Sequence, residues 1–133
     1  MTVGYSGTPL PSKLGVTAHS RVLVLGQPPE TDLGSWDCAA RHTRAGKGRY
    51  DVVLAFAPDL ATLRSRFAPA LAATTHPGRL WVCWPKRSSG VATDLTENIV
   101  RELGLAGGVV DIKVCAIDDT WSGLAFVRRL RDR

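Results

Sequence analysis

The sequence predicts a single three-layer α/β domain with a mostly parallel sheet that closes on an antiparallel pair of strands. Short apolar runs rich in β-branched residues, at 21–26, 51–57 and 80–84, are typical of strands buried on both faces of a parallel sheet. Segments with helical periodicity follow the second and third runs. A short turn near the C-terminus then joins two strands, which must be antiparallel.

Composition limits the class of protein. A chain of 133 residues with 44% apolar and 22% charged content is an ordinary globular domain. No apolar stretch reaches the roughly 18 residues that span a bilayer, and residues 1–7 lack the features of a secretory signal. Three cysteines far apart in the chain predict free thiols, so we expect a cytoplasmic protein without membrane association.

The N-terminal part of the chain has the composition of a loop. Residues 1–20 contain three glycines and two prolines, and we expect an arm laid over a domain that spans 21–133. One helical turn is predicted at 11–14, where a proline suits the first turn. The first strand, 21–26, is followed by a weaker strand candidate at 36–43.

The middle of the chain alternates strand and helix. Pro58 and Asp59 after the strand at 51–57 open a helix that continues to Leu71. Pro69 should kink or shorten this helix, and the sequence at 76–78, His-Pro-Gly, should end it before the strand at 80–84.

A second helix follows the strand at 80–84. Asp94 is predicted as its N-cap, with Glu97 completing a capping box, and Gly104 fits a C-cap. The next strand, 109–117, is followed by a turn bracketed by Asp118-Asp119 and Ser122-Gly123, and a last strand at 124–128 pairs back.

Several strings are similar to those of an uncharacterised bacterial family known as a domain of unknown function, and the similarity extends over the whole chain. They lie at 4–10, 13–15, 84–86, 89–91, 93–95, 114–118 and 121–124. The order of elements also resembles a shortened class I S-adenosylmethionine-dependent methyltransferase, which implies a Rossmann-like fold. The family brings no established activity, so the resemblance implies a fold more than a function.

The methyltransferase resemblance implies a cofactor site, whose chemistry requires a glycine-rich turn after the first strand and a carboxylate after the second. Only Gly26 fits the turn, because Pro28 and Pro29 follow it, and the second strand ends at 43–46 without a carboxylate. We therefore expect no cofactor. A methyltransferase with an unusual pose of S-adenosylmethionine is the enzymatic alternative.

The loop after Trp84 is the candidate ligand site, because ligands of open α/β sheets bind beyond the carboxyl ends of the strands. Lys86, Ser88 and Ser89 supply a cation and two hydroxyls there, ahead of a helix N-terminus that favours anions. The spacing is not that of a Walker loop. A solvated lysine in a plain loop is the alternative.

Further candidate residues flank this loop. Asp118 and Asp119 beside Trp121 could act as acid and base, or bond to their own backbone in a turn. Trp84 and Trp121 could form an aromatic wall, or pack in the core. Asp94 is more readily explained as a cap than as a catalyst, and Tyr5 of the arm could cover the surface.

The leading hypothesis is a non-catalytic domain that binds a small anionic ligand or a protein partner at this surface. Three histidines without partners at useful spacing, and cysteines among apolar neighbours, predict neither a metal site nor a nucleophile. Nucleic acid is a further candidate partner, through basic clusters at 41–49 and 128–133 that contribute to a net charge of +5. The favoured interpretation of these clusters is a solvated tail and a solvated loop.

Overall fold

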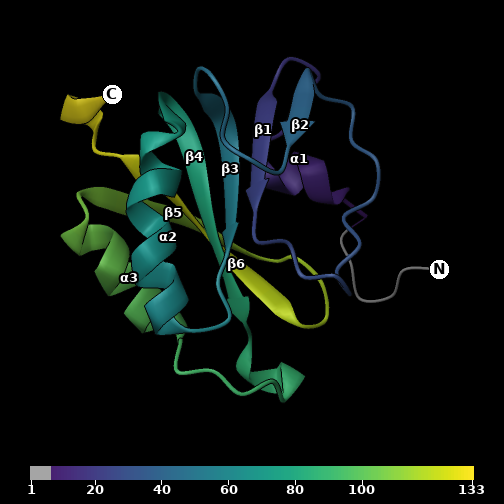
Figure 1. Ribbon diagram of the computed structural model, residues 1–133, viewed down its shortest axis with the longest axis vertical. Helices are drawn as coiled ribbons and strands as arrows, with labels where there is room; N and C mark the ends of the chain where they lie inside the picture. Colours follow the sequence, from purple (N-terminus) through teal and green to yellow (C-terminus); the bar gives the residue numbers. More distant parts are fainter. Residues whose placement is uncertain (1–6) are drawn as a thin grey trace.

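The computed structural model describes residues 7–133, which contain a six-stranded mixed sheet of order β2-β1-β3-β4-β6-β5 (Figure 1). The elements are α1 (Leu10–Leu14), β1 (Arg21–Leu25), β2 (Ala40–His42), β3 (Tyr50–Phe56), α2 (Leu60–Ala72), β4 (Thr74–Pro85), η1 (Arg87–Ser89), α3 (Glu97–Ala106), β5 (Val109–Ala116), β6 (Trp121–Arg128) and η2 (Leu130–Asp132). Strands β2, β1, β3 and β4 are parallel, and β6 is antiparallel to both β4 and β5. The predicted fold class is confirmed.

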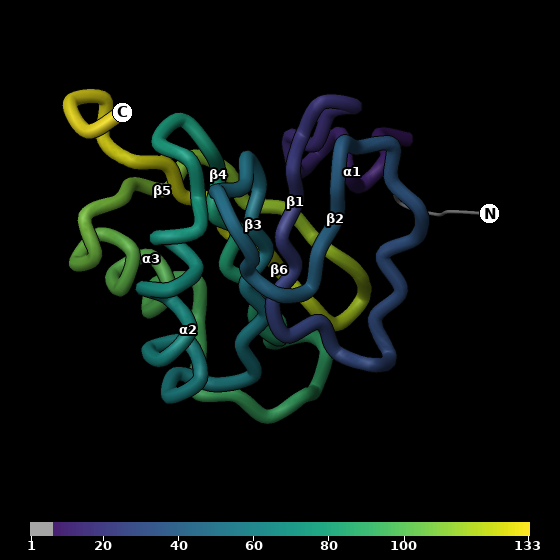
Figure 2. Tube along the Cα trace, turned by 45° about the horizontal axis from the view of Figure 1, so that its top comes forward, coloured from purple at the N-terminus to yellow at the C-terminus, as the bar shows by residue number. Residues whose placement is uncertain are grey.

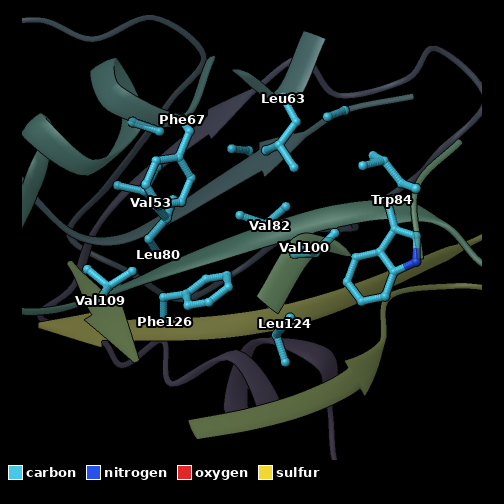
Figure 3. Close-up of a cluster of buried hydrophobic side chains, with 14 of the residues drawn as sticks. Val53, Leu63, Phe67, Leu80, Val82, Trp84, Val100, Val109, Leu124 and Phe126 are labelled. Atoms are coloured by element: carbon cyan, nitrogen blue, oxygen red, sulfur yellow. The ribbon is translucent and has the colours of Figure 1, made fainter. Parts of the chain in front are cut away.

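Both faces of the sheet are covered, which makes three layers. Helices α2 and α3 lie together on one face, apart from α1 (Figures 1 and 2). Phe67 and Val100 from these helices pack on Leu80 and Phe126 of the sheet (Figure 3). On the other face, Leu14 from α1 and other side chains from residues 10–38 pack against the sheet. Continuous apolar strands follow from this arrangement, because alternate residues enter different cores.

Helix α1 is fastened to the sheet by a buried hydrogen bond. The indole Nε1 of Trp81 on β4 donates to the carbonyl of Leu14 at 2.9 Å, and both residues are fully buried. Lys113 on β5 donates from Nζ to the carbonyl of Lys13 at 3.2 Å. The predicted helical turn at 11–14 is therefore confirmed, and it packs on the face of the sheet opposite α2 and α3.

The prediction that His-Pro-Gly at 76–78 ends the first long helix is wrong. Helix α2 ends at Ala72, and 76–78 lie within β4, which begins at Thr74. The pairing with β3 shifts register there, so the proline and glycine occupy an irregular stretch of the ladder. Pro69 does not end the helix, which continues through it.

Asp94 does not cap α3, contrary to the prediction. The side chain of Thr96 caps that helix by accepting from the amide of Ile99 at 3.2 Å. Asp94 Oδ1 instead accepts from the amide of Leu60 at 2.8 Å, which ties the loop before α3 to the start of α2. Thr93 reinforces this connection, because its hydroxyl donates to the carbonyl of Pro58 at 2.7 Å.

Two glycines also differ from their predicted roles. Gly104 lies inside α3 rather than at its end, because the ring of Phe126 fills the place of a side chain. Gly123 lies within β6 rather than in the turn, and a Cβ there would be 3.1 Å from the ring of Trp81. Both positions bring backbone close to an aromatic ring, and at Gly104 a Cβ would clash with that ring.

Candidate functional site

A cavity of about 600 Å³ opens at the carboxyl end of β4. The loop that follows β4 and the first turn of α3 form its walls, and its polar lining includes Lys86, Arg87, Thr93, Asn98 and Ser122. Ligands of open α/β sheets bind at this edge.

The floor of the cavity is apolar. Trp84 is only 4% exposed and belongs to the core beneath α2 and α3, together with Leu95. Figure 3 shows Trp84 at one end of this buried cluster, with Val109 at the other. A ligand in the cavity would therefore meet an aromatic surface below and polar groups around it.

The loop after β4 is held by hydrogen bonds to backbone carbonyls. The amide of Lys86 donates to the carbonyl of Thr120 at 2.8 Å. The carbonyl of Lys86 accepts from the amide of Ser89 at 3.0 Å and from its hydroxyl at 2.7 Å. Gly90 then closes the turn with a φ of 77°. The Ser89 hydroxyl shapes the loop, and Ser88 is exposed; neither lines the cavity described here.

The charges around the cavity are not balanced. The carboxylate in its lining, Glu97, forms an ion pair of 2.7 Å with Arg101, which also pairs with Asp111 at 2.9 Å. Hydrogen bonds to Glu97 and then Asp111 raise the pKa of Arg101. Within residues 7–133 neither Lys86 nor Arg87 forms an ion pair. The site therefore presents two cations without a counter-charge and favours an anion.

The remaining predicted site residues are not brought together. Asp118 Oδ1 accepts from the amides of Thr120 at 2.8 Å and Trp121 at 2.7 Å, so it shapes the turn. Trp121 packs on the opposite face of the sheet from Trp84, edge-to-face with Phe56 at 5.3 Å. The two indoles therefore do not form one aromatic wall.

Asp94 is engaged with α2, as described above, and does not line the cavity described here. Tyr5 lies outside the described residues. Sequence reasoning missed Asn98 and Ser122. Asn98 could have been found from its place in the first turn of α3. Ser122 lines the cavity because it lies opposite Trp84 in the pairing of β4 with β6. The prediction placed Ser122 in the turn before the last strand, so it did not include this pairing.

Neither of the two sheet cysteines is a candidate nucleophile. Burial raises the pKa of Cys83 well above its usual value, and it also raises the pKa of the half-buried Cys115. Both thiols are therefore protonated at neutral pH, when a nucleophile needs the thiolate.

The switch point of the sheet lies between β1 and β3, where the strand order reverses and where this fold class holds a nucleotide-like cofactor. Arg66 of α2 occupies that position. Its guanidinium donates to the carbonyl of Phe56, the last residue of β3. A Cβ on Gly26, just after β1, would lie 2.8 Å from Cζ of Arg66. The residues present therefore do not fit S-adenosylmethionine at this point.

The two basic clusters meet at the opposite end of the sheet from the cavity. In Figure 1 the C-terminus lies at the top and η1 at the bottom. Arg49 contacts His76 at 3.1 Å, and burial together with the charge of Arg49 lowers the pKa of Arg128. Arg128 is structural, because it donates to the carbonyls of Leu71, Thr74 and Thr75.

Two other features are absent from residues 7–133. None of the helices in this part of the chain is long and apolar enough to cross a membrane. Nor do three His, Cys, Asp or Glu side chains gather there closely enough to hold a metal ion.

The chain was compared with protein families, curated proteins and solved structures. No family model and no curated protein matches it, so the resemblance to an uncharacterised bacterial family stays a prediction. Among solved structures it is similar to a "putative Methyltransferase" from Pseudomonas syringae, with a TM-score of 0.52 and 13% identity. The match covers 84% of this chain and 90% of that chain. The chain therefore has a methyltransferase-like α/β fold, and a likeness at this identity extends to the fold alone.

Proposed function

We propose that this chain is a non-catalytic domain of methyltransferase-like fold that binds a small anionic ligand in the cavity at the carboxyl end of β4. One observation carries the proposal. Lys86 and Arg87 line that cavity without an ion pair to any of residues 7–133, whereas its carboxylate, Glu97, is already paired with Arg101. Cations beside an apolar floor and neutral donors make a binding site for an anion.

The polar side chains of the lining support binding rather than catalysis. Asn98 accepts from Arg101 through Oδ1 at 3.1 Å, which leaves its amide nitrogen as a donor. Ser122 adds a hydroxyl. The one carboxylate of the described lining, Glu97, is paired with Arg101, and neither an imidazole nor a thiol lines the cavity. Binding by cations and neutral donors requires no such group.

The proposal includes a cytoplasmic location, where thiols stay reduced, and the three free cysteines support it. We infer membership of the uncharacterised bacterial family from the quoted strings, and that family brings no activity with it. A protein partner that presents a carboxylate or a phosphate at the same cavity would use the same residues.

Titration of the ¹⁵N-labelled protein with inorganic phosphate and with pyrophosphate tests the proposal residue by residue. We expect saturable shifts of the backbone amides at 86–98. The double variant Lys86→Ala/Arg87→Ala should weaken binding at least about tenfold, because both cations are lost. The control Arg44→Ala/Arg129→Ala removes two charges from the opposite end and should leave the affinity unchanged.

Either of two results would contradict the proposal. One is the absence of saturable shifts at 86–98 with both anions. The other is a response confined to 41–49 and 128–133 that moderate salt abolishes, which is the generic behaviour of a basic surface toward phosphates. The second result would move the search to nucleic acid as the partner.

A further inference from the structure

An apolar groove lies between the outer sides of α2 and α3. It has a volume of about 560 Å³, and the partly buried side chains of Leu60, Ile99 and Leu103 line it together with Phe67. Figures 1 and 2 show the two helices side by side on the same face of the sheet. Apolar surface gathered in a groove between helices favours an occupant that removes it from water.

One basic and one acidic side chain also line the groove. Arg64 comes from α2 and Glu102 from α3, and both are exposed. Within residues 7–133 neither Arg64 nor Glu102 forms an ion pair, so they do not pair with each other. The groove therefore carries two opposite charges that are open to groups on an occupant.

The directions of the helices decide which occupant these charges fit. Helix α2 connects β3 to β4, and α3 connects β4 to β5; β3, β4 and β5 all run the same way. Both helices therefore return antiparallel to these strands and parallel to one another. A two-fold axis along the groove would lay α2 of one copy on α3 of the other. Arg64 would then meet Glu102 in both halves of the contact.

The other face-to-face arrangement is disfavoured. A two-fold axis across the helices at the level of Arg64 would lay α2 on α2 and bring the two copies of Arg64 together. In a two-fold interface the same patch serves on both sides, so the patch must be complementary to itself. Arg64 facing Arg64 does not meet this requirement, whereas Arg64 facing Glu102 does. Ala68 and Ala106 in the groove lining are small, which lets helices of a second copy approach closely.

We propose that the α2–α3 groove is the interface of a homodimer, with Arg64 of each copy paired with Glu102 of the other. The interface lies on the helical face of the sheet, apart from the side chains of Lys86 and Arg87 that carry the proposed ligand site. Dimer formation and anion binding can therefore be tested separately.

Charge reversal tests this arrangement by sedimentation equilibrium over a dilution series. The wild type should be a dimer. Arg64→Glu and Glu102→Arg should each weaken the dimer at least about 100-fold, because like charges then face each other twice. The double variant Arg64→Glu/Glu102→Arg should restore it. An equimolar mixture of the two single variants should form heterodimers, because one copy then has two acidic groove walls and the other two basic ones.

Arg44→Glu provides the control for net charge, since Arg44 is exposed in the loop between β2 and β3. This variant should dimerise like the wild type, and unchanged circular dichroism spectra should show that all variants are folded. A wild type that stays monomeric at every concentration would overturn the proposal. So would a double variant or a mixture that fails to recover the dimer.

Discussion

Replacing Trp81 with phenylalanine is expected to lower the free energy of unfolding by about 3 kcal/mol. Trp81 is fully buried, and its Nε1 donates to the carbonyl of Leu14 at 2.9 Å. Phenylalanine cannot donate this bond, so a buried carbonyl loses its partner, and the smaller ring leaves unfilled volume in the core. Urea denaturation followed by circular dichroism measures the loss.

Trp36 provides the matched control. Its Nε1 also donates to a backbone carbonyl, that of Leu33, at 2.8 Å, but the side chain is only partly buried. Trp36→Phe should therefore cost clearly less than Trp81→Phe. In Trp81→Phe we also expect faster tryptic cleavage after Lys13, because α1 is less firmly held. Equal losses of unfolding free energy in the two variants would contradict the role of the Trp81–Leu14 hydrogen bond in holding α1 on the sheet.

Replacing Gly104 with alanine is expected to destabilise the protein by about 2 kcal/mol. In the interior of an exposed helix the same change stabilises by about 1 kcal/mol, so even the sign of the effect is informative. A Cβ on Gly104 would lie 2.5 Å from Cζ and 2.7 Å from Cδ1 of Phe126. Phe126 is buried in the core and has little room to move.

A double-mutant cycle with Phe126→Leu isolates this contact. Gly104→Ala should cost less in the Phe126→Leu background than in the wild type, because the smaller side chain leaves room for the methyl group. Thermal or urea unfolding of the four proteins gives the coupling energy. A Gly104→Ala variant that is as stable as the wild type would contradict the close packing of α3 on β6.

The fold could be predicted because each central strand is a continuous apolar run. Side chains such as Leu80 and Trp81 enter opposite cores, so the pattern itself reports burial on both faces. Helix ends were harder to predict. Asp94 and Thr96 are both good caps by residue type, and only the tertiary position of Asp94 beside Leu60 assigns it to the other helix.

The position of the candidate site in the fold could be predicted, but only some of its residues could. Trp84 and Lys86 line the cavity because the end of a strand and the loop after it must lie at the ligand-binding edge. Ser122 and Trp121 depend on where β6 begins. Since β6 begins at Trp121 rather than 124, Trp121 points to the face away from Trp84, and Ser122 faces the cavity.

We propose that this methyltransferase-like fold binds no S-adenosylmethionine at its switch point, where Arg66 lies, and binds an anion beyond β4 instead. The most direct measurement is a titration of the ¹⁵N-labelled protein with S-adenosylhomocysteine, followed through the backbone amides. We expect no saturable shifts at Gly26, Gln27 or Ala57, because the Arg66 guanidinium lies between β1 and β3. Saturable, stoichiometric shifts at these residues would contradict it and would restore methyl transfer as the function to pursue.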